Sequence, residues 1–238
     1  MNIVDVIVIL LVLFGAVLGF KRGLTKELAT FLGFILVIAF SFLLKNPLSV
    51  FFYEHLPFFS FGGIFKGVSI LNILLYEMIA FLVLLILFTV ILKIVLIITG
   101  IFEKLLSITI ILGIPSKILG MIVGMIEYFV YAFVFLFVFS LPLFDIDEIA
   151  NSKCREQILY HTPILTDLSK ETIQVFEEFR DLKDKYKDDT DVNAFNLEAL
   201  DVFLKYKVIS IDNATKLVES NKLKMENVES VLNKYKEG

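Results

Sequence analysis

The chain has 238 residues, of which 58% are apolar and 20% are charged. Soluble domains average about 45–50% apolar and about 25% charged residues, so this composition excludes a disordered chain and argues against a purely soluble protein. Residues 1–143 hold 8 Lys and Arg against 6 Asp and Glu, whereas residues 144–238 hold 14 against 20. The first part is therefore compatible with a membrane, and the second part with water. The sequence has no basic stripe, which argues against a nucleic-acid partner.

Four apolar runs in the first part predict membrane-spanning helices. Each run is near or above the roughly 18–20 residues that cross about 30 Å of hydrocarbon. Lys21-Arg22-Gly23 ends the first run, and Lys45-Asn46-Pro47 ends the second. The expected spans cover residues 3–20, 25–44, 73–99 and 118–141. A short loop joins the first two, which indicates an antiparallel four-helix bundle in contact with membrane lipids.

The basic residues of the short loops predict the topology, because cytoplasmic loops carry an excess of Lys and Arg. The first and third loops hold more Lys and Arg than the N-terminus and the second loop. We therefore expect a multi-pass protein with both termini outside the cytoplasm.

Two of the connections are themselves apolar. Residues 45–72 are rich in Phe and are broken by Pro57 and Gly62-Gly63. This segment either lies on the lipid headgroups or enters the membrane again beside a cavity. The stretch from Leu105 to Ile114 is too short to span, so an amphipathic helix on the cytoplasmic face, closed by Gly113 and Pro115, is expected there.

Ionisable residues inside the spans are candidates for function, because a charge in hydrocarbon needs a partner. Asp5 and Glu77 lie near span ends and are expected at the interface. Lys93 and Glu127 lie at similar depths on antiparallel helices, so we expect them to form an intramembrane polar pair. The alternatives are that Lys93 reaches the interface and that Glu127 is protonated.

Glycines recur every four residues in the first and fourth spans. Small residues at this spacing share one helix face and let two helices approach closely. The pattern predicts helix packing within the chain or, alternatively, a seam between copies of a homo-oligomer. The glycines are Gly15, Gly19, Gly23, Gly120 and Gly124.

The charged part after residue 143 predicts a small soluble helical extension. Residues 144–190 are expected to form a juxtamembrane helix, at 169–187, and a charged linker. Within 191–238, the pattern that starts at Leu197 recurs 14 residues later at Ile211 and again at Met225. We expect three stacked short helices that dock a protein partner. The fold class is therefore all-α, a four-helix membrane bundle over 1–143 followed by this extension.

Signs of enzyme chemistry are missing from the sequence. His55 and His161 lie far apart, Cys154 is alone, and no phosphate-binding glycine loop is present. We therefore expect a non-enzymatic protein without a catalytic, cofactor or metal site.

Several short blocks together resemble the colicin V production protein family. The most specific block runs Gly19-Phe20-Lys21-Arg22-Gly23-Leu24-Thr25-Lys26-Glu27-Leu28, after an apolar helix that opens with Val4-Asp5. Ser116-Lys117-Ile118-Leu119-Gly120, Asn151-Ser152-Lys153-Cys154 and Thr162-Pro163-Ile164-Leu165 follow in order. The resemblance covers about residues 1–170.

The resemblance implies a four-helix protein of the bacterial inner membrane that supports toxin production or export, or envelope homeostasis. It implies no catalytic residue. The family-motif positions expected to matter, besides the glycines, are Asp5, Arg22, Lys26 and Glu27. This chain has Glu127 where the family commonly has arginine and Tyr128 where glycine is usual. The alternative function is an oligomeric small channel or transporter that uses Lys93 and Glu127.

Overall fold

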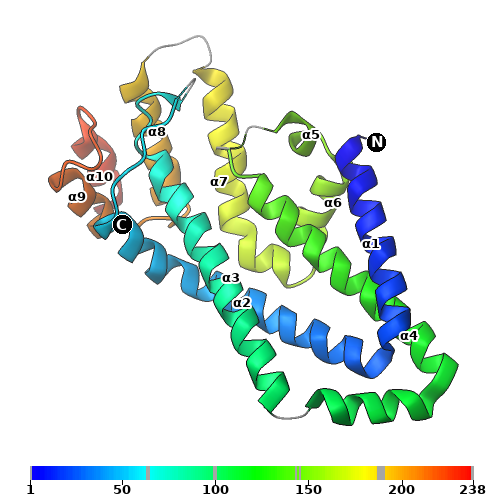
Figure 1. Ribbon diagram of the computed structural model, residues 1–238. Helices are drawn as coiled ribbons and strands as arrows, with labels where there is room; N and C mark the ends of the chain where they lie inside the picture. The colour runs from blue at the N-terminus through cyan, green and yellow to red at the C-terminus, as the bar shows by residue number, and fades with distance from the viewer. Residues whose placement is uncertain are drawn as a thin grey trace. The chain divides into compact units, whose positions relative to one another are not determined.

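The protein is all-α in a computed structural model that describes residues 2–62, 65–98, 101–142, 144, 146–186 and 191–236, with no side-chain detail for 101–112. No strand occurs among these residues. Four helices, drawn in Figure 1, are long and apolar enough to cross a membrane, which confirms the predicted fold class. They are α1 (Ile3–Arg22), α2 (Leu24–His55), α3 (Leu71–Ile98) and the Gly113–Phe139 part of α4 (Ile101–Phe139).

A single glycine separates the first two helices. Asn2 caps α1 in a reciprocal capping box with Asp5, and basic residues occupy the last turn of the helix. Gly23 ends α1 with φ 78°, a backbone conformation that L side chains rarely adopt. The chain then turns directly into α2, whose first amide, on Leu24, donates a 3.1 Å hydrogen bond to Ser116 Oγ of α4.

The second span is longer than the sequence predicted. We expected Lys45-Asn46-Pro47 to end it, but α2 continues through Pro47 to His55. Lys45 and Ser49 are buried on this continuation, so tertiary contacts stabilise a helix that Pro47 would otherwise weaken. The connection that follows also packs inward, with Phe65, Val68 and Ile70 all buried.

The break predicted at Gly113 is present inside α4. Gly113 has φ 54° and ψ −136°, so it divides a helix before it from the spanning part after it. Most of the expected helix at 105–114 lies in the helical segment 101–112, whose amphipathic character is outside the described side chains, and Pro115 lies in the helix that resumes after Gly113 instead of ending one.

The chain divides into two compact units. The first unit contains Met1–Leu43, Leu82–Ser140 and Asp145–Thr166, and the second contains Leu44–Phe81, Leu141–Phe144 and Asp167–Gly238. The division differs from the expected boundaries at residues 143 and 190, because the ends of α2 and α3 group with the C-terminal helices. The expected charged linker lies largely outside the described residues.

The first unit contains two short helices after α4. They are α5 (Asp147–Ala150) and α6 (Lys153–His161), which Ser152 caps by accepting a hydrogen bond from the Arg155 amide. Both α5 and α6 contact α1, so the segment that follows the fourth span lies on the same side of the membrane as the N-terminus.

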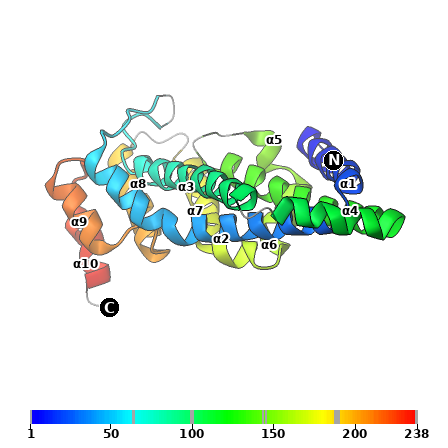
Figure 2. The ribbon, with the colours of Figure 1, turned by 60° about the horizontal axis from the view of Figure 1, so that its bottom comes forward.

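The second unit contains α7 (Leu165–Lys185) from Asp167 onward, and then three short helices. These are α8 (Val192–Lys205), α9 (Ile211–Glu219) and α10 (Val228–Lys236), and α10 packs against both of the others (Figure 2). The expected helix over 169–187 therefore begins four residues earlier, and the three expected helices are present.

The 14-residue repeat is visible in the backbone. After α8, Lys207 has φ 55° and the amide of Val208 bonds to the carbonyl of Phe203. After α9, the equivalent Asn221 has φ 58°, and the amide of Lys222 bonds to the carbonyl of Leu217. The same left-handed helix end, repeated at the same interval, supports a duplicated unit.

Salt bridges on the surface of the second unit should make its helices acid-sensitive. Partial burial would raise the pKa of Glu178, but hydrogen bonds from Lys205 and Tyr206 lower it below its ordinary value; Glu198 behaves likewise with Lys185 and Tyr186. Because a depressed carboxyl pKa stabilises the fold only above the unfolded value, near about 4.3, this contribution is lost as pH falls through the folded values.

We therefore expect the double variant Glu178→Gln with Glu198→Gln to lose less stability than the wild type as pH falls. Circular dichroism in detergent, recorded over a range of acid pH values, measures the stability. Glu219→Gln, on an exposed residue, is the control. An unchanged loss of stability in acid in the double variant would show that the two salt bridges do not contribute.

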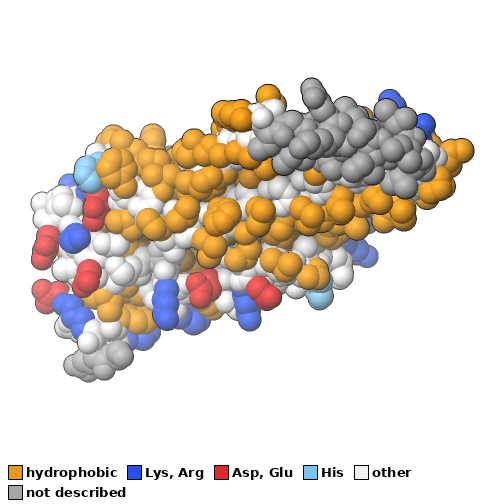
Figure 3. Space-filling view, turned by 90° about the horizontal axis from the view of Figure 1, so that it is seen from below, with side chains coloured by type: hydrophobic (Ala, Val, Ile, Leu, Met, Phe, Trp, Pro, Cys, Tyr) orange, Lys and Arg blue, Asp and Glu red, His pale blue; other side chains and the backbone are white. Residues whose placement is uncertain are grey.

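The surface fits a membrane environment. On α1, Ile3, Leu10 and Phe14 are exposed, while the opposite face carries the buried Val8 and Gly15. Figure 3 shows hydrophobic side chains gathered into broad continuous areas on the face that it draws. Broad continuous apolar areas are unusual on soluble monomers, so lipid is their expected environment.

Candidate functional site

The two glycine stripes predicted from the sequence pack against each other in the first unit, where α1 lies along α4 (Figure 1). A Cβ added at Gly19 would overlap the carbonyl group of Gly120, and one at Gly15 would overlap the carbonyl oxygen of Gly124. The two backbones are therefore in direct contact. This contact uses the glycine faces within one chain, so it leaves them unavailable as a seam between copies.

Two glutamates lie at the end of this glycine contact and are fully buried. Glu27, in the first turn of α2, accepts a 3.4 Å hydrogen bond from Arg22 through Oε2. Glu127 of α4 accepts a hydrogen bond from the Tyr131 hydroxyl through Oε1. Glu27 Oε1 reaches the glycine face of α4, 3.0 Å from the position that a Cβ on Gly124 would take, and the two carboxyl groups interact electrostatically. We call Arg22, Glu27, Glu127 and Tyr131 the carboxyl cluster.

Aromatic rings enclose the carboxyl cluster. The rings of Tyr128 and Tyr131 lie edge to face, with their centroids 4.9 Å apart. Phe34 contacts Tyr131 at 4.5 Å, and Phe14 contacts Tyr128 at 5.8 Å. These contacts shield the two carboxyl groups from lipid and strengthen the electrostatic interactions inside.

The structure does not bring Lys93 to Glu127. Lys93 is exposed on α3, and among the described residues no salt bridge joins it to Glu127. Equal depth in the membrane does not fix the direction in which a helical residue faces, and Glu127 faces α1 and α2. The expected polar pair is therefore replaced by Glu127 with Glu27, close to Arg22.

Asp5, expected at the interface, is instead a buried anchor between α1 and α6. Its Oδ1 accepts hydrogen bonds from Ser152 Oγ at 2.7 Å and from the Cys154 amide at 3.0 Å, while Oδ2 accepts from the Asn2 amide. A carboxylate at the N-terminal turn of α6 is favoured by the helix dipole. The family-motif position Asp5 therefore holds the start of α6 against the start of α1.

This anchor should control the reactivity of Cys154. Burial, followed by the charge of Asp5, raises the pKa of the Cys154 thiol. Replacing Asp5 by Asn removes that charge, so more thiolate forms at a given pH and maleimide labelling should become several-fold faster. Mass spectrometry of timed samples measures the rate, and Glu148→Gln, on an exposed side chain, is the control. An unchanged rate would contradict the influence of Asp5.

The second unit has its own buried ion pair. Lys45 of α2 and Glu77 of α3 form a salt bridge, and Lys45 Nζ also donates to Thr172 Oγ1 of α7 at 3.0 Å. Lys45 is 6% exposed and Glu77 is 4% exposed. Glu77, another residue expected at the interface, thus joins the ends of two spans to the C-terminal helix α7.

Lys222 binds the three helices of the 14-residue repeat, α8 to α10, which we call the repeat helices, to the end of α2. Its Nζ donates to the carbonyl oxygens of Tyr53, Glu54 and Leu56 at 2.5–3.1 Å. A cation at a helix C-terminus satisfies carbonyls that have no intrahelical partner. Within the second unit, the second loop and the C-terminal helices therefore lie on the same side of the membrane.

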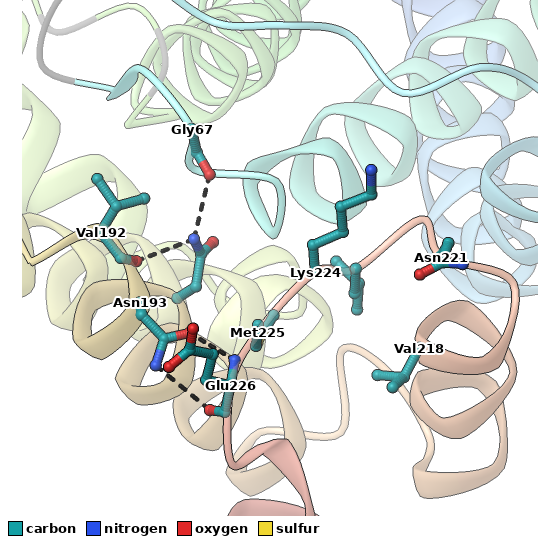
Figure 4. Close-up of a pocket in the computed structure, with 10 residues that line it drawn as sticks. Gly67, Val192, Asn193, Val218, Asn221, Lys224, Met225 and Glu226 are labelled. Atoms are coloured by element: carbon teal, nitrogen blue, oxygen red, sulfur yellow. Dashed lines mark hydrogen bonds between the residues drawn. The ribbon is translucent and has the colours of Figure 1, made fainter.

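A cavity of about 600 Å³ in the second unit is shown in Figure 4. Asn193 spans one wall, because its side-chain amide bonds both to the Glu226 amide at 2.7 Å and to the Glu226 carbonyl at 3.3 Å. Asn196 bonds to the carbonyls of Gly67 and Val192. Since these amides already hold the walls together, the cavity is a weaker site candidate than the carboxyl cluster.

The sequence itself contains a sign of the carboxyl cluster. Glu27 continues the four-residue spacing of Gly15, Gly19 and Gly23, and Glu127 and Tyr131 continue the helix face of Gly120 and Gly124. Lys26, also a motif position, is half-buried, and its carbonyl accepts from Thr30. Among the described residues, no group of three or more His, Cys, Asp or Glu could hold a metal ion.

Comparison with known proteins identifies one family. The family model described as Colicin V production protein matches residues 4–163, which is more than half of the chain. The matched region includes Asp5, the carboxyl cluster and both glycine stripes, and it ends before α8. No curated protein and no solved structure matches the chain.

Proposed function

Since the chain belongs to the colicin V production protein family, as a multi-pass membrane protein, we propose that it is a non-enzymatic accessory of the bacterial inner membrane. In this role it supports the production or export of a peptide toxin, or more broadly envelope homeostasis. The spans provide the membrane anchor, and the helices of the second unit provide the surface for a protein partner.

The observation that carries this proposal is the attachment of the repeat helices to the membrane spans. Lys222 binds the C-terminal end of α2, and Asn196 binds the loop before α3 through the Gly67 carbonyl and the Ile70 amide. A folded helical surface held by the ends of two spans suits a partner that also resides at the membrane. Exposed positions on α10 such as Glu229 and Asn233 remain available for contact.

The experiment is genetic complementation with photo-cross-linking. In a toxin-exporting strain that lacks its own family member, this protein should restore the secreted toxin. Photo-reactive residues at Glu229 or Asn233 should cross-link to one defined protein, while the same residue at lipid-exposed Ile7 should not. Failure to restore export and resistance to envelope stress would contradict the proposed role.

The buried carboxyl cluster favours a second candidate, an ion-conducting oligomer. Intramembrane ionisable groups often mark ion or proton pathways. Reconstituted protein should then leak protons or cations from liposomes, and Glu127→Gln should abolish the leak. Tight liposomes with wild-type protein would leave the accessory role as the better description.

A further inference from the structure

Each carboxyl group of the cluster has one oxygen with a donor and one without. Glu27 Oε2 accepts from Arg22, and Glu127 Oε1 accepts from Tyr131. Glu27 Oε1 and Glu127 Oε2 are buried and have no hydrogen-bond partner among the described groups. Both residues are 0% exposed, so bulk solvent does not reach them. Buried oxygens of this kind cost free energy unless something satisfies them.

The charge of the cluster is also unbalanced if both glutamates are ionised. Among the residues whose side chains the structure describes, the titratable groups that face the pair are Arg22 from α1 and Tyr128 and Tyr131 from α4. Arg22 supplies one positive charge, and neutral tyrosines supply none, so two carboxylates would leave one buried negative charge. Two neighbouring carboxylates repel each other strongly in a low dielectric, which favours the uptake of a proton by one of them.

A single proton resolves both problems. Placed between the two groups, it supplies the donor that the described residues lack, and it neutralises one carboxylate so that the other balances the charge of Arg22. Glu27 is the better site for the negative charge, because it lies beside Arg22 and in the first turn of α2, where the helix dipole favours an anion. The proton therefore belongs mainly to Glu127.

We propose that Glu27 and Glu127 hold one shared proton at the α1–α4 glycine contact, so that the carboxyl cluster is a proton-binding site of the membrane domain. The site depends on neither of the functions proposed above. It differs from simple burial of a protonated Glu127, because the neighbouring Glu27 is required to keep the proton.

A membrane-permeant carbodiimide tests the site, since it reacts with protonated carboxylic acids in apolar surroundings. Protein in liposomes is treated at several pH values, and peptide mass spectrometry locates the adduct. We expect modification of Glu127 at neutral pH that declines as pH rises. The exposed Glu148 serves as the internal control and should stay unmodified.

The Glu27→Gln variant separates a shared proton from simple burial. Without the Glu27 charge, Arg22 is free to stabilise an ionised Glu127, and modification should fall at least tenfold at neutral pH. Undiminished modification of Glu127 in this variant would overturn the shared proton. Protection of the wild-type protein by sodium ions would also overturn the proposal, in favour of a metal-cation site.

Infrared spectroscopy of the folded wild-type protein gives a second measurement, in case Glu27→Gln does not fold. A carbonyl-stretch band of a protonated carboxylic acid should be present at neutral pH and absent from Glu127→Gln. A wild-type spectrum without such a band would overturn the proposal whatever the carbodiimide result. Neither readout requires ion flux or toxin export, so failure of the proposed function would not affect it.

Discussion

Replacing Gly19 by Val should separate α1 from α4 and destabilise the first unit by about 3 kcal/mol. The added Cβ would overlap the backbone carbonyl of Gly120, and backbone cannot move aside as a flexible side chain can. Heating the protein in detergent and measuring the fraction that still elutes as a single species tests this. We expect the midpoint to fall by roughly 5 °C or more.

Gly62→Val is the matched control, because a Cβ at Gly62 meets nothing within 4 Å. It should leave the midpoint unchanged. A Gly19→Val protein that elutes and heats like the wild type would show that the two helices do not pack through their glycines.

The membrane spans and the glycine stripes could be predicted because each depends on local pattern. Length and hydropathy locate a span whatever lies beside it, and glycines at four-residue spacing share a face in any helix. The 14-residue repeat was predictable for the same reason. Gly113 could be identified as a break, since a glycine followed closely by Pro115 disfavours a regular helix.

The partners of the buried charges could not be predicted because they depend on how helices face one another. Lys93 was paired with Glu127 from depth alone, yet depth does not determine which neighbouring helix a side chain meets. Glu127 shares its helix face with Gly120 and Gly124, and this face packs against α1. The depth of Glu127 and the glycine face of its helix together indicate the Gly23–Glu27 segment as its neighbour.

Pro47 shows the same limit for helix ends. A proline after Lys45 and Asn46 is a reasonable local stop, and the helix loses one hydrogen bond there. The buried contacts of Lys45 with Glu77 and Thr172 depend on residues 32 and 127 positions away, and no local pattern contains them. Long-range contacts thus override the local preference at this position.

Breaking the Lys45–Glu77 ion pair from one side should be strongly destabilising. Glu77→Leu leaves a buried ammonium with a hydrogen bond to Thr172 and a weaker attraction to the charge of Glu171, and breaking a buried ion pair from one side costs about 3–5 kcal/mol. The second unit should then lose the connection between α2, α3 and α7. Protease digestion in detergent micelles, followed by mass spectrometry, should show faster cleavage in the C-terminal helices.

The double variant Lys45→Met with Glu77→Leu should recover most of that loss. Both charges are then absent and neither side chain is left buried without a partner, while the volume stays similar. Lys66→Met, at an exposed position, is the matched control and should digest like the wild type. If the double variant is no more resistant than Glu77→Leu alone, the ion pair contributes through its hydrogen bonds with Thr172, which accepts from Lys45 and donates to Glu77, rather than through charge compensation. The wild-type pair would then act chiefly to fix α7 in register on the ends of α2 and α3.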